Sequence, residues 1–313
     1  MASNKSEATK KLEGIIAEFE NEVIPVLIDF SNSTEFMNFC NSAYNDPLSS
    51  GGKLEKQFKG PNRIGINYKF ETREVVPVLL EEDGVDESGI FDRVYMSILE
   101  EVKGNLSLNG MTFFYPAIGH DWRVADIWNE STIVGIDPDE GLNWVRSNVI
   151  LLKQRAQDYD RVEKELKERG LPTKANLILK GSTFALDWSI KASEQPIKTT
   201  RFIDKIINYF RGRYATKEFH PELFDTDNDR RLRLEKLISL YRAKDGLIIA
   251  LNQSDVQMCE KYLKDYNRIE IISPHFREAL RNWSQLEEIY PQPPSLGFWR
   301  TRHEPFAYIR KQN

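Results

Sequence analysis

A glycine and an acid about 18 residues apart are the residues of this sequence with the clearest potential for chemistry. Gly119 stands in the turn Tyr115-Pro-Ala-Ile-Gly-His-Asp121, and Asp137 directly follows an apolar run rich in β-branched residues. A carboxylate can accept hydrogen bonds from both hydroxyls of a ribose. Nucleotide-binding βαβ units present such an acid about 20 residues after their glycine turn. The pair therefore predicts a site for a ribose-bearing ligand.

The elements that must position this pair are two strands and a short helix. Met111 to Tyr115 and Thr132 to Ile136 are apolar runs of strand length, and residues 124–128 suit a short helix between them. This is the layout of a βαβ unit, in which the two strands are parallel. We therefore expect Gly119 and Asp137 to reach the same rim of one sheet.

Strand and helix patterns alternate through the rest of the chain. Residues 142–166 follow a helical rhythm, with Asp137, Pro138 and Glu140 as a predicted N-terminus at its start. Further strands are predicted at 175–180, 247–251 and 269–272, and residues 175–188 together form a bent strand, a hairpin, or a strand followed by a loop. Helices are predicted at 200–210, 230–241, 254–266, which Ser254 caps, and 276–290. Residues 298–302 and 306–310 are predicted to form a hairpin. This order predicts an α/β fold with a mixed, mostly parallel sheet that ends in antiparallel strands.

The first third of the chain has a different pattern. Residues 5–42 and 88–104 read as helices, and residues 63–70 as a strand or an extended arm. We therefore predict two regions, a mainly helical accessory or cap region at 1–105 and a Rossmann-like domain at 106–313.

Composition limits the functional classes. The formal net charge of −5 gives no general attraction to nucleic acid, although a local basic face remains possible. The two cysteines and four scattered histidines predict neither a disulfide framework nor a metal site. The N-terminus lacks the apolar core of a signal peptide, and no apolar run approaches the length of a membrane span, so we expect a cytoplasmic protein.

The order of elements from Leu106 to Asn313 resembles that of the class I S-adenosylmethionine-dependent methyltransferases, whose sheets end in an inverted last strand. The resemblance implies that Tyr115, Pro116, Gly119 and Asp121 lie along the cofactor loop after the first strand. Asp137 would then bind the ribose. In that family this loop is acidic and glycine-rich, whereas here only Gly119 remains and Tyr115 stands in the place of the acid.

The residues of this region also have structural interpretations. Asp121 fits the N-cap of the short helix, and Asp137 fits a helix start. The resemblance implies a catalytic role for Asp187, near the end of the fourth strand, but a structural cap or an ion-pair partner fits it too. His120 is a candidate base in the cofactor turn, against a surface histidine.

The sequence therefore predicts an S-adenosylmethionine-dependent methyltransferase whose acceptor is unknown. The alternative is a catalytically inactive Rossmann-like binding or interaction module that has lost its glycine-rich cofactor loop. A third possibility is a nucleotide-processing enzyme that uses the same crevice. The missing Asp/Asn-Pro-Pro-Tyr/Phe signature argues against the amino groups of bases as acceptors.

Overall fold

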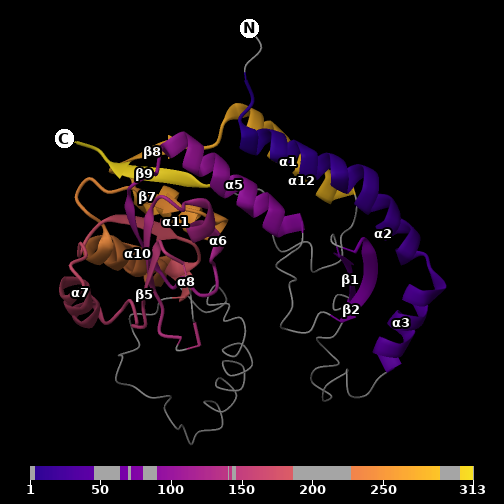
Figure 1. The fold of residues 1–313 in the computed structure, drawn as a ribbon, viewed down its shortest axis with the longest axis horizontal. Coiled ribbons are helices and arrows are strands. Elements are labelled where there is room, and N and C mark those ends of the chain that lie inside the picture. Colours follow the sequence, from indigo (N-terminus) through magenta and orange to yellow (C-terminus); the bar gives the residue numbers. More distant parts are fainter. Residues whose placement is uncertain are drawn as a thin grey trace, which may run out of the picture. The chain divides into compact units, whose positions relative to one another are not determined.

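The computed structural model describes residues 4–45, 64–69, 72–79, 90–139, 141–142, 146–185, 227–289 and 304–312. The chain divides into two compact units (Figure 1). The first unit comprises residues 1–98 and 274–302, and the second comprises residues 99–273 and 303–313.

The first unit is built from helices and one two-stranded antiparallel sheet. Its elements are α1 (Glu7–Glu18), the π-helical turn η1 (Phe19–Val23), α2 (Ile24–Ser31), α3 (Thr34–Asn45), β1 (Ile64–Lys69), β2 (Glu74–Leu79) and α12 (Pro274–Ile289). The late helix α12 packs along α1, and the rings of Phe19 and Trp283 lie 5.2 Å apart. The strand pattern at 63–70 is thus confirmed as β1, whereas the sequence did not predict its partner β2.

The second unit contains a seven-stranded sheet. Its strands are β3 (Thr112–Pro116), β4 (Thr132–Ile136), β5 (Val149–Leu152), β6 (Asn176–Leu179), β7 (Ile248–Ala250), β8 (Tyr266–Glu270) and β9 (Phe306–Arg310). They are ordered β5-β4-β3-β6-β7-β9-β8. The pairs among β3 to β7 are parallel, and β9 lies antiparallel between β7 and β8. The predicted α/β fold is confirmed, and this mostly parallel sheet with one inverted strand is consistent with the class I methyltransferase fold.

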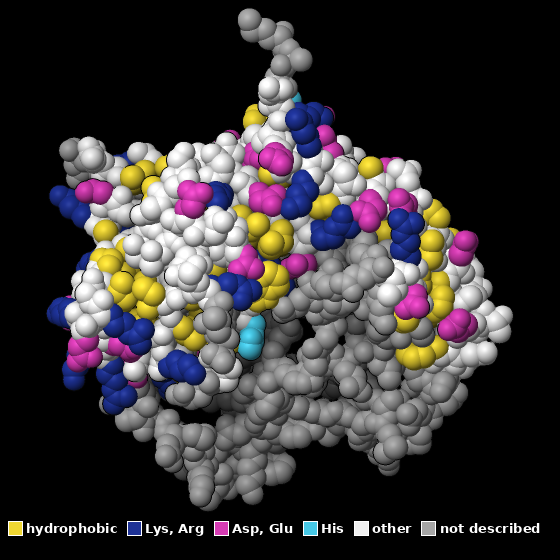
Figure 2. Space-filling view, in the orientation of Figure 1, with side chains coloured by type: hydrophobic (Ala, Val, Ile, Leu, Met, Phe, Trp, Pro, Cys, Tyr) yellow, Lys and Arg dark blue, Asp and Glu magenta, His cyan; other side chains and the backbone are white. Residues whose placement is uncertain are grey.

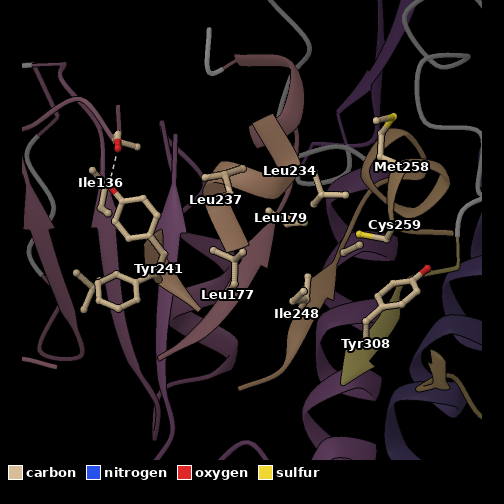
Figure 3. Close-up of a cluster of buried hydrophobic side chains, with 14 of the residues drawn as sticks. Ile136, Leu177, Leu179, Leu234, Leu237, Tyr241, Ile248, Met258, Cys259 and Tyr308 are labelled. Atoms are coloured by element: carbon tan, nitrogen blue, oxygen red, sulfur yellow. Dashed lines mark hydrogen bonds between the residues drawn. The ribbon is translucent and has the colours of Figure 1, made fainter. Parts of the chain in front are cut away.

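Helices cover both faces of this sheet. The helices of the unit are the C-terminal part of α5 (Ile90–Leu106), α6 (Arg123–Ile127), α7 (Tyr159–Glu168), α8 (Ser182–Ala185), α10 (Asp227–Tyr241) and α11 (Gln253–Tyr262). On one face, side chains of α7, α10 and α11 form an apolar core with the strands (Figure 3). The ring of Tyr241 is tilted against that of Phe114, with the ring centroids 5.5 Å apart. The Tyr241 hydroxyl donates a hydrogen bond to the Ala156 carbonyl.

The opposite face is covered by α6 and the C-terminal part of α5, from Leu99 onward. Because side chains alternate along a strand, Phe113 points away from its neighbour Phe114 and packs on Trp128, with the ring centroids 5.4 Å apart. The Trp128 indole N–H donates to the carbonyl of Leu99 at 3.0 Å. Phe113 and Phe114 thus anchor β3 to both helical layers, which fixes the position of the loop that follows the strand.

The predicted long helix over 142–166 is wrong. The chain instead forms β5, a short connection, and α7, which begins at Tyr159. Val149 and Leu152 belong to β5, so their helical spacing was accidental, as short apolar runs allow. Asp137 caps no helix, since the described residues that follow it, 138–139 and 141–142, are not helical.

Two smaller expectations also differ from the structure. Asn252, not Ser254, is the N-cap of α11, and its side chain accepts from the Asp255 amide. The segment after Gly181 begins as the short helix α8 rather than a strand. The predicted helix at 200–210 and the strand at 298–302 lie outside the described residues.

Candidate functional site

The loop after β3 has left-handed backbone at two residues, only one of which is a glycine. Ala117 and Gly119 both have positive φ values, 55° and 51°. Glycine adopts this left-handed conformation at no steric cost, whereas alanine does so at a cost of about 1–2 kcal/mol. The Ala117 amide donates to the Ile136 carbonyl at 2.8 Å, which ties the turn to the end of β4. The loop therefore adopts left-handed backbone at two positions, although only one of them is a glycine.

Gly119 and Asp137 meet at the rim of the sheet, as the two parallel strands predict. The Gly119 amide donates to Asp137 Oδ2 at 3.0 Å, and the Asp139 amide donates to Asp137 Oδ1 at 3.0 Å. A carboxylate has about four lone-pair sites, so two hydrogen bonds do not exhaust this one. Asp137 is half-buried. Its carboxylate is therefore held in place and retains acceptor capacity for a ribose diol.

No described residue occupies the place of a side chain at Gly119. A Cβ added at this position would meet no atom within 4 Å among the described residues. The backbone of the loop is thus open on that side, as close approach of a nucleotide or nucleoside requires.

A buried charged cluster lies beside the loop. Tyr115 Oη donates to Asp121 Oδ2 at 2.7 Å, Lys180 Nζ donates to the same oxygen at 2.9 Å, and Arg123 contacts Asp121 Oδ1 at 3.3 Å. Burial by itself raises the pKa of the Asp121 carboxyl, but the Lys180 charge, the hydrogen bonds from Lys180 and Tyr115, and the Arg123 charge outweigh it and hold that pKa below its usual value. Asp121 is therefore a carboxylate that two cations stabilise.

This cluster joins the carboxyl ends of β3 and β6. Lys180 directly follows β6, and Ser182 Oγ, two residues on, donates to the carbonyl of Pro116 at 2.7 Å. Ligands of open α/β sheets bind at the carboxyl ends of the strands, where the strand order reverses. In this sheet that place is between β3 and β6, so the two links lie at the expected crevice.

Asp255 of α11 fixes the loop after β6. Its carboxylate accepts from the Gly181 amide at 2.5 Å, from the Thr183 amide at 3.3 Å and from the Thr183 hydroxyl. Complete burial raises the pKa of the Asp255 carboxyl above its usual value, against the effect of these hydrogen bonds. Asp255 thus holds Gly181, whose φ is 77°, in the conformation that starts α8.

The remaining predicted site residues have different surroundings. His120 is exposed on the loop. Pro116 is the last residue of β3. The alternative interpretation of Asp121 as the N-cap of α6 is wrong, because Trp122 is the N-cap and has no side-chain cap bond. Asp187 lies outside the described residues.

Sequence reasoning missed Lys180, Ser182 and Asp255. Lys180 had a usable signal, since it directly follows an apolar strand, and ligands bind at the carboxyl ends of such strands. Ser182 and Asp255 had none, because their partners are 66 to 74 residues away in sequence.

Surface charge, helix length and the placement of possible metal ligands bear on nucleic-acid, membrane and metal partners. On the face drawn in Figure 2, basic and acidic side chains of the described residues are interspersed. Within the described ranges, no helix is both long and apolar enough to cross a bilayer. In that same part of the chain, no group of three or more His, Cys, Asp or Glu side chains is placed to hold a metal ion.

Comparisons with known proteins find similarity in structure alone. No family model matches the sequence, and no curated protein does. A Streptococcus mutans protein described as a SAM-dependent methyltransferase matches with 11% identity and a TM-score of 0.36, over 79% of this chain and 55% of that one. This chain thus spans about half the length of that protein.

Two further solved structures are methyltransferases with bound SAH. The plantazolicin methyltransferase BpumL matches with 9% identity and a TM-score of 0.33, over 96% of this chain and 99% of that one. Coclaurine N-methyltransferase, bound to N-methylheliamine and SAH, matches with 12% identity and a TM-score of 0.26, over 97% and 98%. At these scores the likeness carries no weight of its own, and the strand order and strand directions of this chain identify the fold.

Proposed function

We propose that this protein is an S-adenosylmethionine-dependent methyltransferase. The observation that carries the proposal is the 3.0 Å hydrogen bond between the Gly119 amide and the Asp137 carboxylate, at the carboxyl ends of neighbouring parallel strands. It brings an open backbone position and an acceptor for a ribose diol to one rim. The strand order of the sheet supports the same cofactor class.

In this proposal the residues of the rim bind and orient the cofactor. Asp137 accepts the ribose hydroxyls, and the backbone around Gly119 lies against the methionine part. When bound, the cofactor would supply an electrophilic methyl group: an acceptor nucleophile would form the new bond to carbon as the C–S bond breaks, and the bonding pair would stay on sulfur in a neutral thioether. Because the sulfonium is already a good leaving group, positioning supplies most of the rate.

A thermal-shift series tests the proposal. SAM, SAH, NAD and ATP are each added to the wild type, to Asp137→Ala and to Asp139→Ala. A ligand that binds only the folded state stabilises it by about 2.7 kcal/mol at a hundredfold excess over Kd. We expect SAM and SAH alone to stabilise the wild type and Asp139→Ala, and stabilisation to be lost in Asp137→Ala. Equal responses to NAD or ATP would contradict the proposal.

A second candidate function is an inactive binding or interaction module. Two observations favour it, namely that Tyr115 stands in the place of the family's acid and that the Lys180–Asp121 and Ser182–Pro116 links tie the two loops together. A wild type that responds to none of the four ligands would support this module and exclude the methyltransferase.

A further inference from the structure

Gly135 of β4 provides the space that the loop after β3 occupies. Gly135 has strand conformation, so its backbone angles do not require glycine. A Cβ at this position would lie 2.9 Å from Ile118 Cδ1, 3.0 Å from Ile118 Cγ2 and 3.4 Å from Leu151 Cδ1. The first two distances are shorter than ordinary van der Waals contact. A side chain at 135 would therefore press against Ile118, which fills the place of a Cβ at this position.

Ile118 is the buried apolar anchor of the loop. It is 2% exposed and lies between the two positive-φ residues Ala117 and Gly119. The far methyl, Cδ1, can rotate away from an added Cβ. The branching methyl, Cγ2, moves only with χ1 or with the backbone, because β-branched side chains are stiff at χ1. A side chain at 135 would therefore displace the loop itself.

Displacement of the loop would act on the rim. Gly119 follows Ile118 directly, and its amide makes the 3.0 Å hydrogen bond to Asp137. Hydrogen bonds weaken steeply when distance and angle depart from their preferred values. A shift of a few tenths of an ångström at Ile118 thus reaches both groups that the proposed cofactor site uses.

We infer that Gly135 and Ile118 are positioning residues for the cofactor ribose, acting through Gly119 and Asp137. Neither side chain touches the ligand in this inference. The contact between them sets the height of the loop above β4 and thereby the geometry of the rim. The inference rests on the proposed function for the identity of the ligand and on the contact distances for the positioning.

A double-variant cycle tests the contact. SAH binding is measured by calorimetry for the wild type, Gly135→Ala, Ile118→Ala and the double variant, with Gly104→Ala as the control. A Cβ at Gly104 in α5 meets nothing within 4 Å among the described residues, so binding should be unchanged there. We expect each single variant of the pair to weaken binding about tenfold, equivalent to about 1.4 kcal/mol.

Coupling between the two positions is the decisive result. If Ile118 and Gly135 share one space, the double variant should bind clearly better than the product of the two single effects predicts. Independent, multiplicative effects would overturn the inference, and so would unchanged binding in Gly135→Ala. Should Gly135→Ala fail to fold, recovery of folding and binding in the double variant would support the inference, and no recovery would overturn it.

A readout without ligand separates this inference from the proposed function. Amide hydrogen exchange of Gly119 is measured by NMR in ligand-free protein labelled with ¹⁵N-glycine. We expect faster exchange in Gly135→Ala, since the hydrogen bond to Asp137 is weakened, and unchanged exchange in Gly104→Ala. If the wild type bound no SAH, the proposed function would fail. Faster Gly119 exchange in Gly135→Ala would then still support the positioning of the loop, and unchanged exchange would overturn it.

Discussion

Replacement of Asp121 by asparagine tests the buried cluster between β3 and β6. Asp121 is 8% exposed and Lys180 14%, and the carboxylate accepts from Tyr115, Lys180 and Arg123. Asparagine keeps the shape and one acceptor oxygen but removes the charge that the two cations share. Loss of one partner of a buried ion pair costs about 3–5 kcal/mol. Because Lys180 is partly solvated and one acceptor remains, we expect a loss of about 3 kcal/mol.

Calorimetry converts this value into a measurable shift. For a unit of this size, 1 kcal/mol corresponds to about 2–4 °C in Tm, so Asp121→Asn should lower the Tm of the second unit by about 6–12 °C. Asp126→Asn is the matched control, since its ion pair with Arg146 is 32% and 40% exposed. Exposed pairs contribute about 0–1 kcal/mol, and the control should shift Tm by less than about 4 °C.

The pH dependence of the same difference checks its cause. The folded-state pKa of Asp121 is lowered from 3.8. A carboxyl with a lowered folded-state pKa stabilises the protein above its unfolded-state pKa, and this contribution is lost as the pH falls through the folded value. The gap between wild type and Asp121→Asn should therefore be constant from about pH 5 to 7 and shrink below about pH 4. Equal Tm losses in Asp121→Asn and Asp126→Asn, or a gap that persists in acid, would refute the reasoning.

Two further substitutions have expected outcomes. Gly119→Ala should lower the free energy of unfolding by only about 1–2 kcal/mol, from the positive φ alone. It should nevertheless weaken SAH binding by at least tenfold, because the new methyl enters the open side of the loop. Calorimetry measures the stability and the Kd, and a Kd equal to that of the wild type would contradict this expectation. Tyr241→Phe should destabilise by about 1–2 kcal/mol in urea unfolding, since the buried hydroxyl bonds the Ala156 carbonyl. Tyr262→Phe is its control, because the hydroxyl of Tyr262 bonds the Asp227 carbonyl at 3.4 Å in an exposed position. Similar losses in both variants would contradict the assignment.

The strands of the sheet were predicted correctly where a recognisable turn or helix pattern flanks them in the sequence. The apolar runs of β3 and β4, separated by a turn and a short helix, are confirmed as parallel neighbours. The inverted strand β9 was recognisable from its alternation close to the C-terminus. β5 was not, because Val149 and Leu152 continue a helical rhythm with Ala156 and Tyr159. Periodicity alone does not separate a four-residue strand from part of a helix.

Only the part of the site that strand positions determine could be predicted from the sequence. Parallel strands carry Gly119 and Asp137 to one rim whatever the side chains between them. The Asp-Pro-Asp-Glu segment resembled a helix start, but the Asp137 carboxylate binds the Gly119 amide, 18 residues earlier. Lys180 was recognisable as the residue after an apolar strand, but its bond to Asp121, 59 residues away, was not. Such bonds depend on tertiary packing, for which a single sequence carries no direct signal.

Titration calorimetry of SAH into the wild type, Asp137→Ala and Asp139→Ala tests most directly whether the rim binds a nucleoside cofactor. Hydrogen bonds to a charged group contribute about 1.5–3 kcal/mol each, so loss of the Asp137 carboxylate should weaken binding by at least tenfold. Asp139 accepts from the Gly141 amide, and its removal should leave the Kd within about threefold, since it is not assigned to the ribose. Saturable binding that Asp137→Ala alone impairs is the predicted result. No binding to the wild type, or equal affinity in all three proteins, would contradict it.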